Sequence, residues 1–302
     1  MANESTIRAY GGQAVLGGVM MRGATTWAVA VRRPTGEIAL HQDLVPGWGK
    51  HWSGIPVVRG LVSLAESLTL GGRALDWAGR QHEAGGGGDD TAPTRSGPVD
   101  TLITIVAVVL AVGLFVAVPA VVARATPGVT GGVRLSVVEG VLRIGLLVAY
   151  VSGIGRVPEI ERLYQYHGAE HKAVTALEAG AELTPASVGR FSTRHPRCGT
   201  TFLLVVMVVA VVAHAFLGRP SWPLLIASRL LLVPVVAGVS FELIRWAARH
   251  VDRPWVARAL APGLALQRLT TREPSAEQVE VALAALHAVV AADGRAEAEP
   301  VT

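Results

Sequence analysis

Long blocks of apolar residues alternate with polar segments along this chain. Residues 101–123 contain no charged side chain, and about 20 consecutive apolar residues are enough to cross a hydrocarbon core of about 30 Å. Three further apolar blocks occupy residues 135–155, 200–217 and 222–244. The pattern predicts a membrane protein, mainly α-helical, with about four transmembrane helices.

Several ionisable side chains interrupt the apolar segments. Glu139 and Arg143 lie four residues apart, on one face of a helix, where they could neutralise each other. Glu66, His214 and Glu242 are candidates for function, because polar groups are costly at membrane depth. Ion pairing or hydrogen bonding between helices explains each of them equally well.

The positions of arginine and lysine predict the orientation in the membrane. Positive side chains gather between the second and third blocks and again after the fourth, whereas the connections on the opposite side carry only Arg124, Arg134 and Arg219. Because positive loops stay on the cytoplasmic side, both termini and the segment between the second and third blocks are expected in the cytoplasm.

The polar regions suggest further units. Two short strands, residues 27–31 and 38–41, are joined by a good turn sequence at residues 34–37. Ser275 and Gln278 form a candidate capping box that opens a helix to about residue 292, after an irregular stretch at 262–274. The expected organisation is a small β-rich cytoplasmic unit (1–54), an interfacial or re-entrant helix (55–80), a flexible linker (81–98), transmembrane helices 1–2 (99–155), a cytoplasmic loop with a metal site (156–199), transmembrane helices 3–4 (200–246), a C-terminal cytoplasmic segment with a helix (247–292) and a disordered tail (293–302).

Composition narrows the class of partner. Hydrophobic residues make up 51% of the 302 residues and charged residues 17%, with a mean hydropathy of +0.43. A net charge of +4 and a pI near 9.7 could indicate nucleic acid binding. The arginines, however, lie beside the apolar blocks and not in one stripe interleaved with aromatic residues, so no nucleic acid is expected. Cys198 is the only cysteine, which rules out an intramolecular disulfide.

The strongest chemical signal is the sequence His-Gly-Ala-Glu-His at residues 167–171, inside a helix expected over residues 158–178. Histidines four residues apart project from one helical face and can hold one metal ion, and Glu170 between them can act as a general base on a bound water. The order is that of the inverzincin metallopeptidases. Glu178 lies on the same face of the helix and is one candidate for a third ligand.

A second cluster stands where the third apolar block begins. His195 and Cys198 could add a nitrogen and a sulfur ligand, and Arg197 could bind an anionic group such as a lipid phosphate. An ordinary turn at the start of a helix explains the same residues, because Pro196 restricts the backbone and Arg197 is typical of the cytoplasmic membrane border.

A glycine-dense segment at residues 11–23 lacks the Gly-Lys-Ser/Thr ending of a phosphate-binding loop. Its glycines are expected to allow tight turns or close approach of the backbone. Gln13 and Arg22 are candidates for lining a binding site.

Several separated motifs closely resemble the bacterial YqhQ family, which is described as predicted metal-dependent membrane enzymes of unknown function. They are the glycine-dense segment at residues 11–23, residues 166–172, residues 195–200, Pro262-Gly-Leu, Leu266-Gln267 and Thr270-Thr271. The resemblance runs from Tyr10 to about Val290. It implies a multi-pass protein of the bacterial plasma (inner) membrane with a metal site drawn from His167, Glu170, His171, Glu178, His195 and Cys198. This chain has Gly17 where the family usually has glutamate.

Taken together, these patterns favour a membrane-bound metal-dependent hydrolase. His167 and His171 would hold a divalent metal ion, with zinc expected, and Glu178, His195 or Cys198 would complete the coordination. Glu170 would be the catalytic base, and Gln13, Arg22 and Arg197 would bind substrate at the cytoplasmic membrane surface. Candidate partners are membrane lipids, other membrane proteins or further copies of the chain. The alternatives are a non-catalytic membrane protein that uses the same histidines structurally and, ranked last, a metal transporter.

Overall fold

The protein combines a small antiparallel sheet with many helices, and the computed structural model describes residues 10–52, 54–83, 98–218 and 220–298. Most of the predicted linker, residues 84–97, lies outside the described residues. The strands are β1 (Gly11–Val15), β2 (Gly18–Arg22), β3 (Thr26–Arg32) and β4 (Ile38–Leu44). The helices are α1 (Gly49–Trp52), α2 (Val58–Glu83), α3 (Pro98–Val112), the π-helix η1 (Gly113–Ala117), α4 (Val118–Ala125), α5 (Gly132–Ile154), α6 (Pro158–Glu178), α7 (Pro185–Val188), α8 (Gly199–Ala215), α9 (Trp222–Leu231), α10 (Val233–Ala248), α11 (Pro254–Thr270) and α12 (Ala276–Ala298).

The strands follow one another in the order β1-β2-β3-β4, each antiparallel to its neighbours. The predicted strand pair is confirmed, since Val29 of β3 lies opposite His41 of β4. The sequence did not predict β1 and β2, because their glycines disfavour strands. They form a hairpin whose turn places Gly17 at φ +67°, a conformation that glycine adopts without strain.

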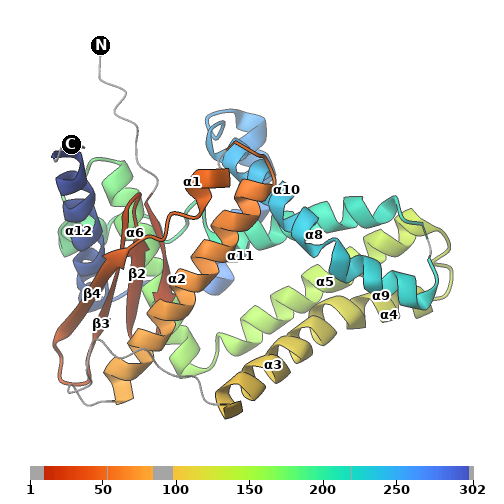
Figure 1. Ribbon diagram of the computed structural model, residues 1–302, viewed down its shortest axis with the longest axis horizontal. Coiled ribbons are helices and arrows are strands. Elements are labelled where there is room, and N and C mark those ends of the chain that lie inside the picture. The colour runs from red at the N-terminus through yellow and green to blue at the C-terminus, as the bar shows by residue number, and fades with distance from the viewer. Residues whose placement is uncertain (1–9, 53, 84–97, 219, 299–302) are drawn as a thin grey trace.

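Helices cover both faces of the sheet (Figure 1). Alternate residues of β3 point to opposite faces. Trp27 and Val29 pack with Trp77 of α2 in one buried cluster, whereas Ala28 packs in a second cluster with Leu286 of α12 and residues of α6. The resulting three layers hold α6 firmly against the sheet.

Two C-terminal expectations need correction. The stretch at residues 262–274 is not irregular throughout, because α11 continues through Pro262 to Thr270. Proline removes one backbone hydrogen bond, but α11 is supported by packing against α8 and α5.

The helix that follows, α12, continues to Ala298, beyond the expected end near residue 292, and Asp293 is fully buried. Its capping box is confirmed: the Gln278 N–H donates to Ser275 Oγ (3.3 Å), and the Ser275 N–H donates to Gln278 Oε1 (2.8 Å).

Apolar helices extend to one side of the sheet (Figure 1). Within the described residues, two segments are long and apolar enough to cross a membrane, Thr101–Ala125 (α3, η1 and α4) and Gly132–Ile154 (α5). Helices α9 and α10 make a third candidate if they form one span bent by 42°. The shorter α8 is also apolar. The break at Leu232 precedes Pro234, whose missing N–H weakens the helix at this point.

The carboxylates that the sequence singled out are paired with arginines. Arg143 Nη2 lies 2.6 Å from Glu139 Oε1, which confirms the predicted pair. Glu66 bonds Arg22, and Glu242 bonds Arg59. Glu66, Glu139 and Glu242 therefore all have arginine partners, which leaves His214.

Candidate metal centre

Helix α6 carries the histidine motif, and its ends have clear local causes. The extended Val157 is followed by Pro158 in the first turn, where proline is favoured. At the other end Gly180 adopts φ +63°, and the Gly180 and Ala181 N–H groups donate to the carbonyls of Leu177 and Ala176. This glycine cap ends the helix at Glu178, so the bounds agree with those expected from the sequence.

His167 and His171 are oriented by backbone carbonyl groups. Nδ1 of His167 lies 2.9 Å from the Thr270 oxygen, and Nδ1 of His171 lies 2.6 Å from the Thr193 oxygen. A carbonyl oxygen only accepts hydrogen bonds, so each Nδ1 carries a hydrogen, and in the neutral ring Nε2 then has the free lone pair. This is the arrangement found around metal-binding histidines.

Cys198 completes a group of three side chains that could hold a metal ion. One ligand atom from each of His167, His171 and Cys198 lies within 4.8 Å of the others. Sγ of Cys198 is 3.3 Å from Nε2 of His167. Tetrahedral zinc, with bonds of about 2.0 to 2.3 Å, holds its ligand atoms roughly 3.3 to 3.7 Å apart. The distance between Cys198 and His167 falls in this range, and the three donors could hold one metal ion.

Glu170 lies beside this cluster. Its Oε2 is 3.5 Å from Nε2 of His171 and 4.0 Å from Nε2 of His167, and the residue is buried. Gly12 of β1 packs against it, since a Cβ there would come within 3.2 Å of Glu170 Cγ and 2.2 Å of the Met20 oxygen. The glycine lets β1 approach the site closely.

Glu178 and His195 bond each other instead of joining the group of His167, His171 and Cys198. Oε2 of Glu178 is 3.2 Å from Nε2 of His195, and Oε1 forms an ion pair with Arg197. The Arg197 N–H donates to Nδ1 of His195, so both ring nitrogens have partners. Burial lowers the pKa of His195, an effect that the nearby Glu170 carboxylate opposes.

Gln267 and Gly168 support the walls of the site, although no role was predicted for them from the sequence. Gln267 is fully buried and bonds both the N–H and the carbonyl of His195 (2.9 and 2.8 Å). Gly168 lies under the segment after α11, where a Cβ would come 2.1 Å from the Arg272 oxygen. The sequence signal that could have identified Gln267 was its place in the family motif Leu266-Gln267 with Thr270-Thr271.

A cavity of about 310 Å³ opens beside the cluster. Gln13, Arg22 and Arg197 all line it, together with the three ligand candidates, Glu170 and His195. Arg22 is fixed by Glu66 and by Ser67 Oγ (3.0 Å), and burial lowers the pKa of Arg197. Gly17 lies outside this cavity, at the hairpin turn against His82.

Comparisons with known proteins agree with the resemblance seen in the sequence. Residues 55–292 match the model of a family described as "Protein of unknown function (DUF1385)". The chain is 31% identical over 299 residues to "Uncharacterized protein YqhQ" of Bacillus subtilis (strain 168), which covers 94% of this chain and 92% of the relative. No solved structure gives a significant match.

Proposed function

This chain belongs to the DUF1385 family of proteins of unknown function, and we propose that it is a metal-dependent hydrolase at the cytoplasmic surface of the bacterial plasma membrane. The observation that carries the proposal is the convergence of His167, His171 and Cys198, with both histidines oriented through Nδ1.

In this proposal each group of the site has a distinct role. His167, His171 and Cys198 would hold the ion, and the bound ion would act as a Lewis acid. Glu170 takes the proton from the attacking water, because its carboxylate lies beside the ligand atoms. Gln13, Arg22 and Arg197 bind the substrate through their N–H groups, which suit oxygen acceptors such as those of a lipid head group or a membrane-proximal peptide.

The membrane arrangement that goes with this role has four passes: α3 to α4, α5, α8, and the bent pair of α9 and α10. The two connections far from the sheet lie against each other, since Arg124 Nη1 donates to the Pro220 oxygen (2.6 Å). The sheet, the metal centre and both termini then lie in the cytoplasm, on the side richer in arginine.

A non-catalytic metal site is the alternative, and one distance favours it. Glu170 Oε2 lies 3.5 Å from His171 Nε2, a separation that would also suit two ligands of one ion. Four protein ligands would close the coordination and leave no position for substrate, and the protein would then serve in a complex with membrane partners.

Metal analysis of the protein purified in detergent tests both possibilities. We expect about one divalent ion per chain, lost in His171→Ala and retained in His287→Ala, whose imidazole is exposed on α12. A metal-free wild type would overturn the proposal. Glu170→Gln should keep the ion if Glu170 is the base and release it if Glu170 is the fourth ligand.

A further inference from the structure

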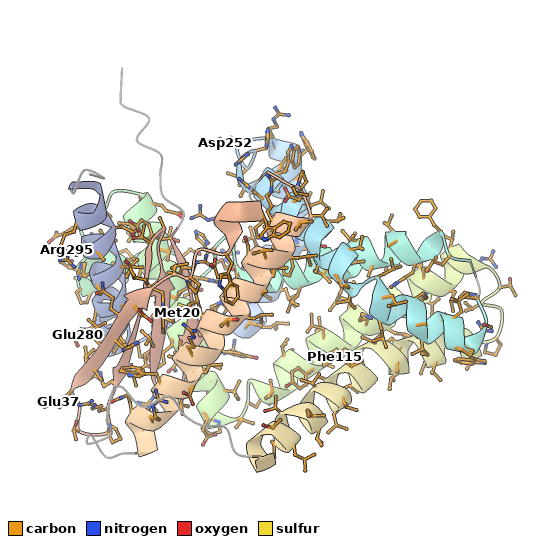
Figure 2. All side chains as sticks on the ribbon, viewed as in Figure 1. Met20, Glu37, Phe115, Asp252, Glu280 and Arg295 are labelled. Carbon is orange, nitrogen blue, oxygen red and sulfur yellow. The ribbon has the colours of Figure 1, made fainter. Side chains whose placement is uncertain are left out.

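A second cavity, of about 440 Å³, lies among the apolar helices, and the proposed function makes no use of it. Figure 2 shows Phe115, which lines this cavity, among the long helices, well away from Met20, which lines the cavity of the metal centre. The volume lies within the range of about 300 to 1,000 Å³ that is usual for small-molecule sites.

The cavity has a charged end. Arg143 and Arg229 both line it, and both bond the buried Glu139, Arg143 Nη2 at 2.6 Å and Arg229 Nη2 at 2.7 Å. One carboxylate against two guanidinium groups leaves one positive charge without a counter-ion within this cluster. An uncompensated charge is costly between apolar helices.

A histidine lies at the same end. His214 lines the cavity and is 4% exposed, and its Nε2 has no hydrogen-bond partner among the described residues. A buried polar atom without a partner is rare in native proteins and calls for an explanation. A ligand oxygen would provide the partner.

The rest of the cavity is apolar and elongated. Its lining on α5 runs from Arg143 through Leu147 to Val151, two helical turns or about 12 Å. Helix α8 packs against α5, with Gly140 beside Val211, and adds Met207. Leu203 and Val233, at 45% and 51% exposed, also line the cavity, so it reaches the outer surface of the helices.

The π-helix η1 contributes to the charged end. Arg143 Nε donates to the Phe115 oxygen in η1 at 2.9 Å. Single π-turns interrupt the regular hydrogen bonding of a helix and are frequent at functional sites. This one places Phe115 and Val116 in the cavity wall beside the guanidinium.

We propose that this cavity binds an amphiphile with an acidic headgroup. The headgroup lies against Arg143, Arg229 and His214, where it neutralises the surplus charge, and the apolar chain extends along Leu147 and Val151 towards Leu203. A fatty carboxylate and a single-chain lipid phosphate share this chemistry. The site is separate from the metal centre, so the two proposals stand or fall independently.

Native mass spectrometry of the full chain, titrated with palmitate, tests the proposal. We expect saturable binding of one palmitate, weaker by about tenfold or more in Ala210→Phe, which fills the cavity and leaves every charge in place. Arg143→Gln leaves a neutral Glu139–Arg229 pair, so palmitate should bind about tenfold or more weakly while hexadecanol binding stays the same. Lysophosphatidate as competitor distinguishes the phosphate from the carboxylate source. Absence of saturable binding by either acidic probe, or Ala210→Phe binding as tightly as the wild type, would overturn the proposal.

Discussion

The Nδ1 atom of His171 lies 2.6 Å from the carbonyl oxygen of Thr193, 22 residues further along the chain. The same type of contact joins His167 to Thr270, 103 residues away. Each histidine is therefore oriented by a different distant segment, and the metal centre depends on the packing of both segments against α6. Outer contacts of this kind usually matter for metal affinity almost as much as the ligands themselves.

Of the three candidates for a third ligand, Cys198 is the one grouped with His167 and His171 in the part of the chain that the structure describes. Cys198→Ser should weaken zinc binding by roughly tenfold or more, because a hydroxyl is a poorer ligand than a thiolate. Glu178→Gln should leave zinc affinity within a few-fold, since this carboxylate bonds His195 and Arg197. Competition with a chromophoric chelator measures both. The reverse ranking of the two variants would assign the ligand to Glu178.

Gln267 should couple stability to metal binding. Gln267→Ala leaves the buried His195 N–H without its partner, which costs about 1–3 kcal/mol. It also removes one of the two hydrogen bonds to the His195 carbonyl, which keeps the Cys198 N–H, and displaces the loop that carries Cys198. We expect a lower Tm and a zinc affinity reduced by about 10- to 100-fold. The control is Gln278→Ala at the start of α12, which should lower Tm and leave zinc affinity unchanged. Equal zinc affinity in the two variants would contradict the role of Gln267.

Gly168 should tolerate no side chain. Gly168→Ala places a Cβ 2.1 Å from the Arg272 oxygen, so the backbone after α11 must move, at a cost of about 1–3 kcal/mol. The displacement also shifts the Thr270 carbonyl away from His167. Gly72→Ala on α2, where a Cβ meets nothing within 4 Å, should be neutral or slightly stabilising. Thermal unfolding and zinc titration compare the pair, and an unaltered Gly168→Ala protein would refute the close contact.

The buried triad predicts that two neighbouring substitutions differ in severity. Glu139→Gln leaves Arg143 and Arg229 facing each other without a counter-ion, and breaking a buried pair in this way costs about 3–5 kcal/mol. Arg143→Gln leaves a neutral pair and should be much milder. The yield of monodisperse protein and its Tm in detergent provide the comparison. A Glu139→Gln protein as stable as Arg143→Gln would rule out this charge balance.

The proposed topology predicts which surfaces are accessible from outside the cell. Thr130→Cys, exposed in the connection between α4 and α5, should react with a membrane-impermeant maleimide in intact cells. Ser192→Cys, exposed near the metal centre, should react only after lysis. The wild type sets the background, because its Cys198 is buried. Labelling of Ser192→Cys in intact cells would invert the orientation.

Local sequence patterns were enough to predict several elements. Proline at residue 158 and glycine at residue 180 set the ends of α6, and Ser275 with Gln278 marked the start of α12, because these signals act within one helical turn. The pair Glu139–Arg143 followed from a four-residue spacing. The glycine-rich strands β1 and β2 could not be predicted in this way, since strand pairing depends on a partner elsewhere in the chain.

The sequence by itself determined the helical class, the apolar blocks and the residues able to bind metal, because hydrophobic periodicity and side-chain chemistry are local properties. The tertiary structure alone decided that Cys198 meets His167 while Glu178 turns to His195 and Arg197, and that Arg229 joins the Glu139–Arg143 pair. Those contacts join residues 17 to 90 positions apart, so they exist only once the helices and the sheet have packed.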